Sequence, residues 1–391
     1  MLTFSETGTI IYFLLTIFGA VFFAYCADKF GKRKVHMVFW VLSFLILFIP
    51  SAFRESGVDH SSYYHHYTLA KSYGYDYFAN YKGSPEPLFA LLLFFSANFF
   101  DNFHIIYIVS SFLGLVFTYI GFSKMYGKTS LSLVIFWFSV TYYMIFFGLV
   151  RLSIAVGIMT YAFHLIAEKK TKKYFFLCTI ATMFHYSAGF MFLVYFVLRR
   201  NSFKLRKKTH NEHGVQLEEL ASNVNLKTKK LKIKRRILFI GIALLGVYWL
   251  FPYFFGGFNW FPRYIQYFKY DFNLKTINNL AGYYLLILLL MFTYKKVKVN
   301  IPESNQLLTF FWLMCSIALV TVKFPVIRLL YYFMPVGCYL YAFVPRLFNK
   351  YLRVYVYSIY LAYGLIWWYY TYFMQEAWGE FILPYTLKFV W

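Results

Sequence analysis

Residues 54–67, with the sequence RESGVDHSSYYHHY, concentrate side chains that can exchange protons or bind a polar substrate. The stretch directly follows the apolar run VFWVLSFLILFIPSAF. Asp59, Tyr63 and Tyr67 are spaced by four residues, so a helix would place them on one face. We interpret this face as a carboxylate and two phenols directed into an aqueous cavity. The alternative is an interfacial helix whose tyrosines lie at the depth of the lipid headgroups.

Further ionisable residues interrupt apolar runs elsewhere in the chain. Glu86 lies in PEPLF, Arg151 in VRLSIAVG, His185 in FHYSAG, Arg263 in WFPRYIQY and Arg328 in VIRLLYYF. A charge inside the hydrocarbon of a membrane costs at least about 2.5–3.5 kcal/mol, so such residues should face water and one another. We therefore expect them, together with Arg54, Asp59 and His60, to lie at one side of a membrane.

Arg151, Arg263 and Arg328 are candidates for binding a diphosphate, because a guanidinium group pairs with two phosphate oxygens at once. Their neighbours Tyr264 and Tyr331 are further substrate-binding candidates. The alternative is that the three arginines form separate salt bridges or contact lipid headgroups.

Three residues are candidates for the base of an acid–base reaction, namely Asp59, His185 and Glu86. Arg54, His60, Tyr63 and Tyr67 are candidates for binding the substrate near that base. The alternative for His185 is a buried histidine whose hydrogen bonds are satisfied within the core. The pair His65–His66 lacks a third ligand at a spacing typical of zinc sites.

Composition shows which elements must position these residues. Of the 391 residues, 61% are hydrophobic and 14% are charged, and a soluble globule has too little interior for that much apolar surface. Apolar runs about as long as a bilayer is thick predict an all-α, polytopic membrane protein with roughly ten to twelve transmembrane helices. The expected spans include those at about 8–27, 35–53, 104–123, 129–148, 150–167 and 237–255. We expect residues 1–391 to form a single integral membrane domain.

The distribution of Lys and Arg predicts the orientation of the spans. Basic clusters such as DKFGKRK and EKKTKK mark the cytoplasmic side. This rule places a basic loop, residues 199–236, in the cytoplasm, and loops 54–85 and 256–280 outside. It also places both termini outside the cytoplasm.

Two apolar segments do not fit simple spans. The run PEPLFALLLFFSANFF is short and reads as a re-entrant or interfacial segment. Residues 174–198 would, as one continuous span, carry the basic loop 199–236 to the wrong side. We therefore predict a helix that is broken near His185, since broken helices occur where they line a cavity.

Several function classes are disfavoured. The net charge of +24 lies mostly in juxtamembrane clusters, which are typical of contacts with anionic lipids and not of nucleic-acid binding. The four cysteines lie in apolar runs without paired spacing, which gives no sign of disulfides or a thiolate metal site. There is no Walker A motif, no dinucleotide-binding loop and no D-x-D pair for a metal-bound nucleotide sugar. We expect no cofactor and no metal.

The order of these motifs resembles the EpsG-like polymerases, which belong to the wider Wzy-type polysaccharide polymerases. The resemblance is most specific in R-x-x-G-x-D-x-x-x-Y, from Arg54 to Tyr63, and in F-H-x-S-A, from Phe184 to Ala188. One departure follows Arg151, where the family commonly has glutamine and this chain has Leu152.

The resemblance implies an enzyme of the bacterial plasma membrane that polymerises undecaprenyl-diphosphate-linked oligosaccharide repeat units into a capsule, exopolysaccharide or O-antigen. A chain-length regulator and a flippase would be candidate partners. Two alternatives remain open: a flippase or other transporter of the lipid-linked oligosaccharide, and a lipid-dependent ligase that attaches finished glycan to another acceptor.

Overall fold

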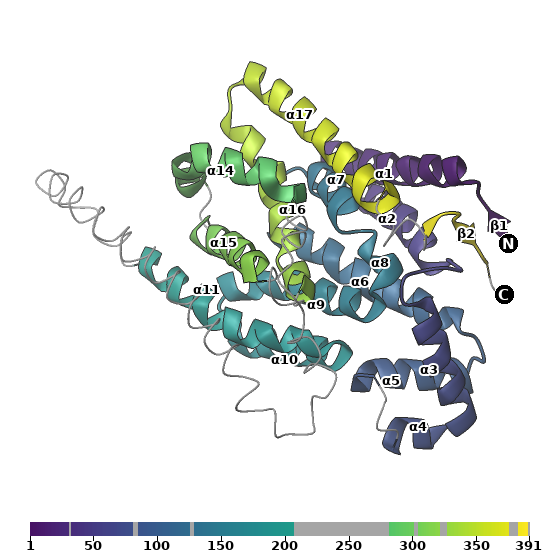
Figure 1. Ribbon diagram of the computed structural model, residues 1–391. Helices are drawn as coiled ribbons and strands as arrows, with labels where there is room; N and C mark the ends of the chain where they lie inside the picture. The colour runs from purple at the N-terminus through teal and green to yellow at the C-terminus, as the bar shows by residue number, and fades with distance from the viewer. Residues whose placement is uncertain are drawn as a thin grey trace, which may run out of the picture.

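The computed structural model is mostly helical (Figure 1). It describes residues 1–30, 33–80, 85–125, 129–206, 281–300, 304–320, 327–374 and 382–389. The expected outer loop 256–280, the expected span near 237–255 and most of the basic loop 199–236 lie outside these ranges.

The described residues form α-helices, short helical segments and one pair of short strands. The helices are α1 (Glu6–Lys29), α2 (Arg33–Ala52), α3 (His60–Tyr73), α4 (Tyr75–Asn80), α5 (Pro87–Asn98), α6 (His104–Met125), α7 (Leu131–Thr141), α8 (Ile145–Gly148), α9 (Val150–Ala167), α10 (Thr171–Phe184), α11 (Phe190–Arg206), α14 (Ala281–Asn300), α15 (Ser304–Val320), α16 (Met334–Phe343) and α17 (Lys350–Tyr369). The short turns are η1 (Tyr186–Gly189), η4 (Ile327–Tyr332), η5 (Val344–Leu347) and η6 (Tyr370–Met374), and the strands are β1 (Leu2–Thr3) and β2 (Thr386–Leu387).

Among the described residues, four helices are long and apolar enough to cross a membrane. They are Glu6–Lys29, Lys34–Ala52, His104–Lys124 and Val150–Ala167, and all four lie where the sequence predicted spans. The prediction of an all-α, multi-pass membrane protein is confirmed. The total of ten to twelve spans stays a prediction.

The last of these helices, α9, lies at the centre of the bundle. In α9, 83% of the span residues are buried, whereas in α1 only 39% are buried. Leu15 and Phe22 are among the exposed residues of α1. A Cβ atom on Gly157 would lie 2.3 Å from the carbonyl oxygen of Gly114, so α9 packs against α6 with almost no side chain between the two backbones. This packing fixes the end of α9 that carries Arg151.

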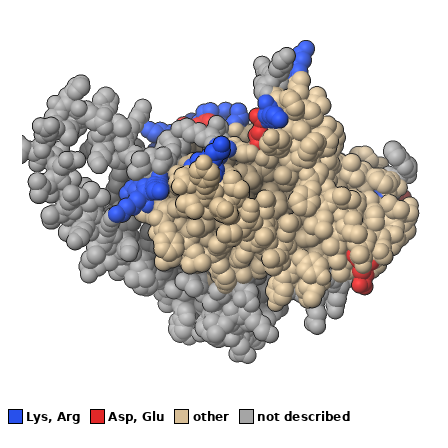
Figure 2. Space-filling model, turned by 90° about the horizontal axis from the view of Figure 1, so that it is seen from above, with Lys and Arg blue, Asp and Glu red and all other residues tan. Residues whose placement is uncertain are grey.

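The outer surface agrees with burial in lipid. Figure 2 shows a face that is almost entirely uncharged, with Lys and Arg side chains gathered toward one edge. Large apolar side chains are exposed on the outer helices, including Phe22 on α1 and Ile359 and Ile366 on α17. Exposed apolar residues of this size are typical of lipid contact.

Contacts at the two ends of the bundle show the relative directions of α1, α2 and α7. Asp28, near the end of α1, accepts a hydrogen bond from the backbone N of Leu131 at the start of α7 (3.2 Å). At the opposite end of the bundle, the Tyr143 hydroxyl donates to the carbonyl of Leu47 near the end of α2 (2.5 Å). Arg151 and Lys170 thus lie at opposite ends of α9, roughly 27 Å apart for its 18 residues.

Several expected spans are broken. The predicted break near His185 is present: α10 ends at Phe184, the turn η1 follows, and α11 begins at Phe190. The segment near 129–148, expected as one span, instead ends as helix α7 at Thr141 and continues into the four-residue helix α8. The hydroxyl groups of Tyr143 and Thr141 bond to backbone carbonyls near this break.

Helices α3, α4 and α5 form a small unit at one end of the bundle (Figure 1). Their shared apolar cluster includes Tyr63, Phe89, Tyr107 and Val150, which also ties the unit to α6 and α9. The 12 residues of α5 reach about 18 Å, too short for a bilayer of about 30 Å. This length agrees with the predicted re-entrant or interfacial segment.

The two ends of the chain lie side by side (Figure 1). Strands β1 and β2 pair in antiparallel fashion, with Leu2 opposite Leu387 and Thr3 opposite Thr386. Arg54 forms an isolated β-bridge to Leu387, so both described ends lie beside the start of the loop that precedes α3. The two ends and this loop are therefore at the same end of the bundle.

Candidate functional site

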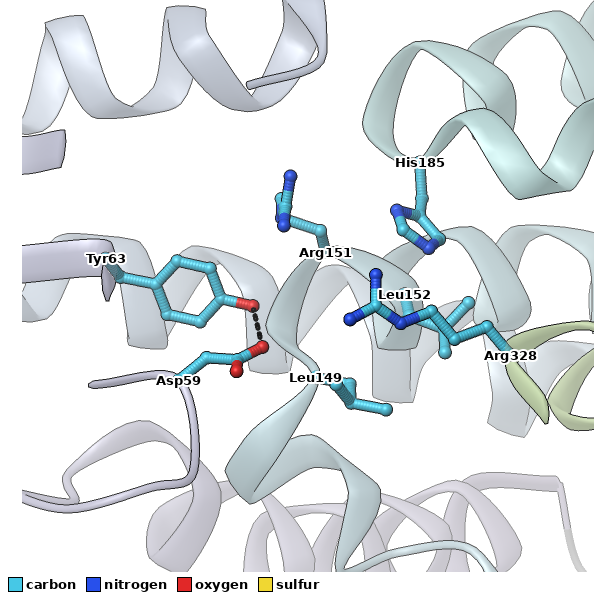
Figure 3. A pocket seen from close by; sticks show the side chains of 7 residues that line it. All are labelled: Asp59, Tyr63, Leu149, Arg151, Leu152, His185 and Arg328. Atoms are coloured by element: carbon cyan, nitrogen blue, oxygen red, sulfur yellow. Dashed lines mark hydrogen bonds between the residues drawn. The ribbon is translucent and has the colours of Figure 1, made fainter. Parts of the chain in front are cut away.

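A small pocket collects residues from four separate segments, and Figure 3 shows them converging from different sides. Its empty volume is about 180 Å³. The lining residues are Asp59 and Tyr63 from the start of α3, Leu149, Arg151 and Leu152 from α9 and the residue before it, His185 from the break after α10, and Arg328 from η4. Five of these seven were candidates from the sequence.

Glu86 lies behind the pocket and connects two of its residues. Its Oε2 accepts a hydrogen bond from Nη1 of Arg151 (2.5 Å), and its Oε1 accepts one from Nδ1 of His185 (2.8 Å). Glu86 is the residue before α5, so the short helix and the break after α10 must pack together for the contact to form. The carboxylate is 3% exposed and therefore belongs to the framework of the site and not to its open surface.

The charge state of Glu86 follows from these contacts. Burial favours the neutral acid, but the hydrogen bond from His185 and the positive charge of Arg151 outweigh it and lower the pKa of Glu86 to about 2. Glu86 is therefore an anion at neutral pH. Besides Arg151 and His185, the backbone N of Tyr186 donates to Oε1 of Glu86 (3.4 Å). A carboxylate that stays ionised and accepts from three donors is a weak choice for a base and a good choice for an orienting group.

His185 has one ring nitrogen in use and one free. Because Nδ1 donates to Glu86, the neutral ring must carry its proton there, which leaves a lone pair on Nε2. Within the described part of the chain, Nε2 of His185 is buried and has no hydrogen-bond partner. A side chain that lines the pocket and holds an unused acceptor is suited to take a proton from a bound hydroxyl group.

Asp59 and Tyr63 form a second polar pair in the pocket. The Tyr63 hydroxyl donates to Oδ2 of Asp59 at 3.2 Å (Figure 3). Burial raises the pKa of Tyr63 to about 12, so its phenol keeps the proton that it donates. The ring of Tyr63 also lies 5.8 Å from the guanidinium carbon of Arg151, which places the two polar pairs next to each other.

The two arginines of the pocket differ in their partners. Arg151 is paired with Glu86, and its guanidinium also lies 5.7 Å from the ring of Phe89. Arg328 is half-buried and has no ion-pair partner among the residues that the structure describes. Arg328 is thus the uncommitted cation of the pocket and the first candidate for binding an anion.

Arg54 does not reach the pocket. It is 1% exposed, its Nη1 donates to the carbonyl of Ser51, and its guanidinium carbon lies 4.0 Å from the ring centre of Tyr107 and 5.3 Å from that of Phe147. A Cβ atom on Gly57 would lie 2.1 Å from the carbonyl oxygen of Phe147, so only glycine fits there. The R-x-x-G-x-D pattern therefore corresponds to a packed turn that places Asp59 at the pocket.

The remaining sequence candidates lie apart from the pocket. Nδ1 of His60 contacts the Tyr107 hydroxyl (2.7 Å), and the Tyr67 hydroxyl donates to Asp101 (3.2 Å). The buried ring of Tyr331 lies beside Tyr142. Arg263 and Tyr264 lie outside the described residues.

Some features of the site were missed by the sequence analysis. Glu86 links Arg151 and His185, which are 65 and 99 positions away in the sequence. No local sequence pattern predicts contacts over such distances. Leu149 and Leu152 make one wall of the pocket apolar, at the position where the sequence departs from the Arg-Gln pattern. The described residues contain no group of three or more His, Cys, Asp or Glu placed to hold a metal ion.

Part of the chain is similar to a known protein family. The model of the EpsG family matches residues 37–209, which include Asp59, Glu86, Arg151 and His185. The resemblance to the EpsG family is thereby confirmed. No curated protein and no solved structure matches the chain.

Proposed function

We propose that this chain polymerises undecaprenyl-diphosphate-linked oligosaccharide repeat units into a surface polysaccharide. The match of residues 37–209 to the EpsG family supports a role in surface polysaccharide biosynthesis. The finer proposal rests on the pocket. It combines a cation that has no acid partner among the described residues, a Glu–His pair with an unused ring nitrogen, and an Asp–Tyr pair. These groups suit the transfer of a sugar from a diphosphate to a hydroxyl group.

The leaving group is the lipid diphosphate. As the bond between the anomeric carbon and the diphosphate oxygen breaks, its electron pair stays on that oxygen and the negative charge grows. Arg328 would bind this charge directly, and Arg151 would add to the positive potential from behind. An arginine already in place offers its donors without a cost of reorganisation at the moment of transfer.

The attacking group is a sugar hydroxyl of the next repeat unit. Its oxygen forms the new bond to the anomeric carbon, and its proton passes to Nε2 of His185. Glu86 would stabilise the resulting imidazolium through its hydrogen bond to Nδ1. In this arrangement the carboxylate orients the histidine, and the histidine takes the proton from the attacking hydroxyl group, as in other carboxylate–histidine pairs that activate a nucleophile.

Asp59 is the second candidate for the base. Its carboxylate also faces the pocket, and the Tyr63 hydroxyl holds one of its oxygens. In the scheme that we favour, Asp59 accepts a hydrogen bond from another hydroxyl of a bound sugar and stabilises positive charge on the reacting ring. The two roles predict different losses when Asp59 and His185 are replaced.

The reaction would take place on the extracytoplasmic side of the plasma membrane. The pocket residue Arg151 and the basic residue Lys170 are at opposite ends of α9, and basic residues favour the cytoplasm. The pocket is small against a lipid-linked oligosaccharide, so only the reacting ends of the donor and the acceptor would contact it.

The proposal is tested by comparing polymer from cells that carry wild type, His185→Ala or Asp59→Asn, with protein level measured in the membrane. Wild type should give a ladder of repeat multiples, His185→Ala only single repeat units, and Asp59→Asn a strongly shortened ladder. A normal ladder from His185→Ala would refute the assignment of the base. A single addition in place of a ladder from wild type would indicate a ligase.

A further inference from the structure

The loop that carries Asp59 is held by the opposite end of the chain. In the C-terminal segment, residues 382–389, Leu387 forms a β-bridge with Arg54. The carbonyl of Thr386 accepts a hydrogen bond from the backbone N of Glu55 (3.2 Å), and the backbone N of Lys388 donates to the carbonyl of Phe53 (2.8 Å). The main chain before Asp59 is thus paired with a segment more than 300 residues away.

Side chains reinforce this pairing. Nζ of Lys388 lies 3.0 Å from Oε1 of Glu55, and Oε2 of the same carboxylate lies 3.2 Å from Nε2 of His104 at the start of α6. The ion pair is partly exposed, with 40% of the Lys388 side chain and 31% of the Glu55 side chain accessible. One carboxylate therefore joins the C-terminal segment, the loop and the bundle.

Tyr385 anchors the segment in the core. It is completely buried, and its hydroxyl donates to the carbonyl of Pro50 at 2.5 Å. Its ring centre lies 5.0 Å from that of Phe13 and 6.0 Å from that of Phe147. The carbonyl oxygen of Phe147 in turn lies against Gly57. Tyr385 therefore supports the turn before Asp59 through its contact with Phe147.

The loop needs this support because Asp59 does not use its side chain to stabilise the helix. Asp59 occupies the position before α3, where an aspartate side chain ordinarily accepts a hydrogen bond from the first turn and stabilises the helix. Its carboxylate makes no such hydrogen bond and lines the pocket instead. The position of Asp59 therefore depends on contacts of the preceding residues as well as on the hydrogen bond from Tyr63.

We propose that the C-terminal segment, residues 382–389, is a positioning element of the candidate site. It fixes residues 53–55 by main-chain pairing and by the ion pair between Lys388 and Glu55, and it thereby sets the place of Asp59 in the pocket. Its effect on catalysis rests on the proposed function, whereas its contact with the loop does not. Lys388, Glu55 and Tyr385 touch no reacting atom in this scheme and act through Asp59.

The first test is a charge reversal in purified protein acting on lipid-linked repeat units. Lys388→Glu and Glu55→Lys should each lower kcat by roughly 10- to 100-fold, since a shift of about 1 Å in a reacting group costs about 100-fold, while KM for the donor stays unchanged. The double variant should recover most of the loss. Lys170→Glu, which breaks the similarly exposed pair with Glu168 on the other end of the bundle, is the matched control.

A second measurement tests the contact between the C-terminal segment and the loop even if a variant folds poorly or if the protein is not a polymerase. The hydroxyls of Thr3 and Thr386 are 3.2 Å apart, so Thr3→Cys with Thr386→Cys should form a disulfide. In a Val58→Cys background, Lys388→Glu should raise the rate of labelling by a membrane-impermeant maleimide, and the disulfide should reverse that rise.

The outcomes separate the two proposals. Wild type that makes no polymer overturns the proposed function, and the labelling rates then still decide whether the segment holds the loop. Full kcat in both single variants, or a double variant no better than either, overturns the positioning role. Unchanged labelling of Val58→Cys in Lys388→Glu overturns the contact itself.

Discussion

Oε1 of Glu86 lies 2.8 Å from Nδ1 of His185, and both side chains are almost completely buried. The other oxygen of the same carboxylate holds Arg151. One anion therefore sets the tautomer of the candidate base and neutralises one of the two pocket arginines. The chemistry of the pocket depends on a residue that is not in it.

Replacing Glu86 with glutamine should impair the site without emptying the space that the side chain fills. Glu86→Gln removes the negative charge that Arg151 and His185 face, and loss of one partner of a buried ion pair costs about 3–5 kcal/mol. We expect polymer to be lost and the melting temperature of the purified protein to fall. The measurement is thermal unfolding in detergent together with a polymer ladder from cells.

The control for this variant is Glu168→Gln, whose carboxylate pairs with Lys170 at the exposed end of α9. Exposed ion pairs contribute about 0–1 kcal/mol, so its melting temperature and ladder should match wild type. Equal behaviour of the two variants would contradict the linking role of Glu86.

The two pocket arginines should respond differently to replacement by alanine. Arg328→Ala removes a cation that has no acid partner among the described residues, so polymer should disappear while the melting temperature stays near that of wild type. Arg151→Ala also leaves the buried carboxylate of Glu86 without its cation. This variant should therefore lower both the polymer yield and the melting temperature. Thermal unfolding and polymer analysis of the same preparations check this contrast, and a large stability loss in Arg328→Ala would count against it.

Gly57 should tolerate no side chain. In Gly57→Ala the new Cβ would lie 2.1 Å from the carbonyl oxygen of Phe147, so the turn before Asp59 must move. Polymer synthesis should fall by at least about tenfold, because the moved turn carries Asp59 out of place. Gly189→Ala, beside His185 but with its nearest contact at 3.7 Å, is the control and should retain activity.

Both described ends of the chain should be accessible from the same side of the membrane. Strands β1 and β2 pair with each other, and Lys170 lies at the other end of the bundle. In intact cells an impermeant maleimide should label single cysteines at Leu2 and at Phe389, and it should not label Lys170→Cys until the membrane is broken. Labelling of Lys170→Cys in intact cells would reverse the orientation that we propose.

The sequence was sufficient for the four long helices and for most of the pocket residues. Long apolar runs predict spans because only a helix satisfies its backbone inside lipid, and α1, α2, α6 and α9 all lie where those runs occur. The break at His185 was predictable because a continuous span would have carried basic residues to the wrong side. The position of Asp59, Tyr63, Arg151, His185 and Arg328 in one pocket agrees with the interpretation that charges in apolar runs gather at water.

The sequence could not reveal which polar groups pair. Arg54 was a substrate-binding candidate, but its guanidinium packs on Tyr107 and Phe147, which are 53 and 93 positions away. Tyr67 shares the helical spacing of Tyr63, yet Asp101 takes its hydroxyl because the loop before α6 returns to that side of α3. Such choices depend on how separate helices pack, and helical spacing within one segment carries no information about the neighbours that each face meets.

The central claim is tested most directly by adding a synthetic undecaprenyl-diphosphate-linked repeat unit to the purified protein in liposomes and separating the glycan products by size. The account predicts a ladder of repeat multiples, release of undecaprenyl diphosphate in proportion to the bonds formed, and neither product from Arg328→Ala or His185→Ala. Wild type that leaves the repeat unit unextended while moving it across the bilayer would contradict the account.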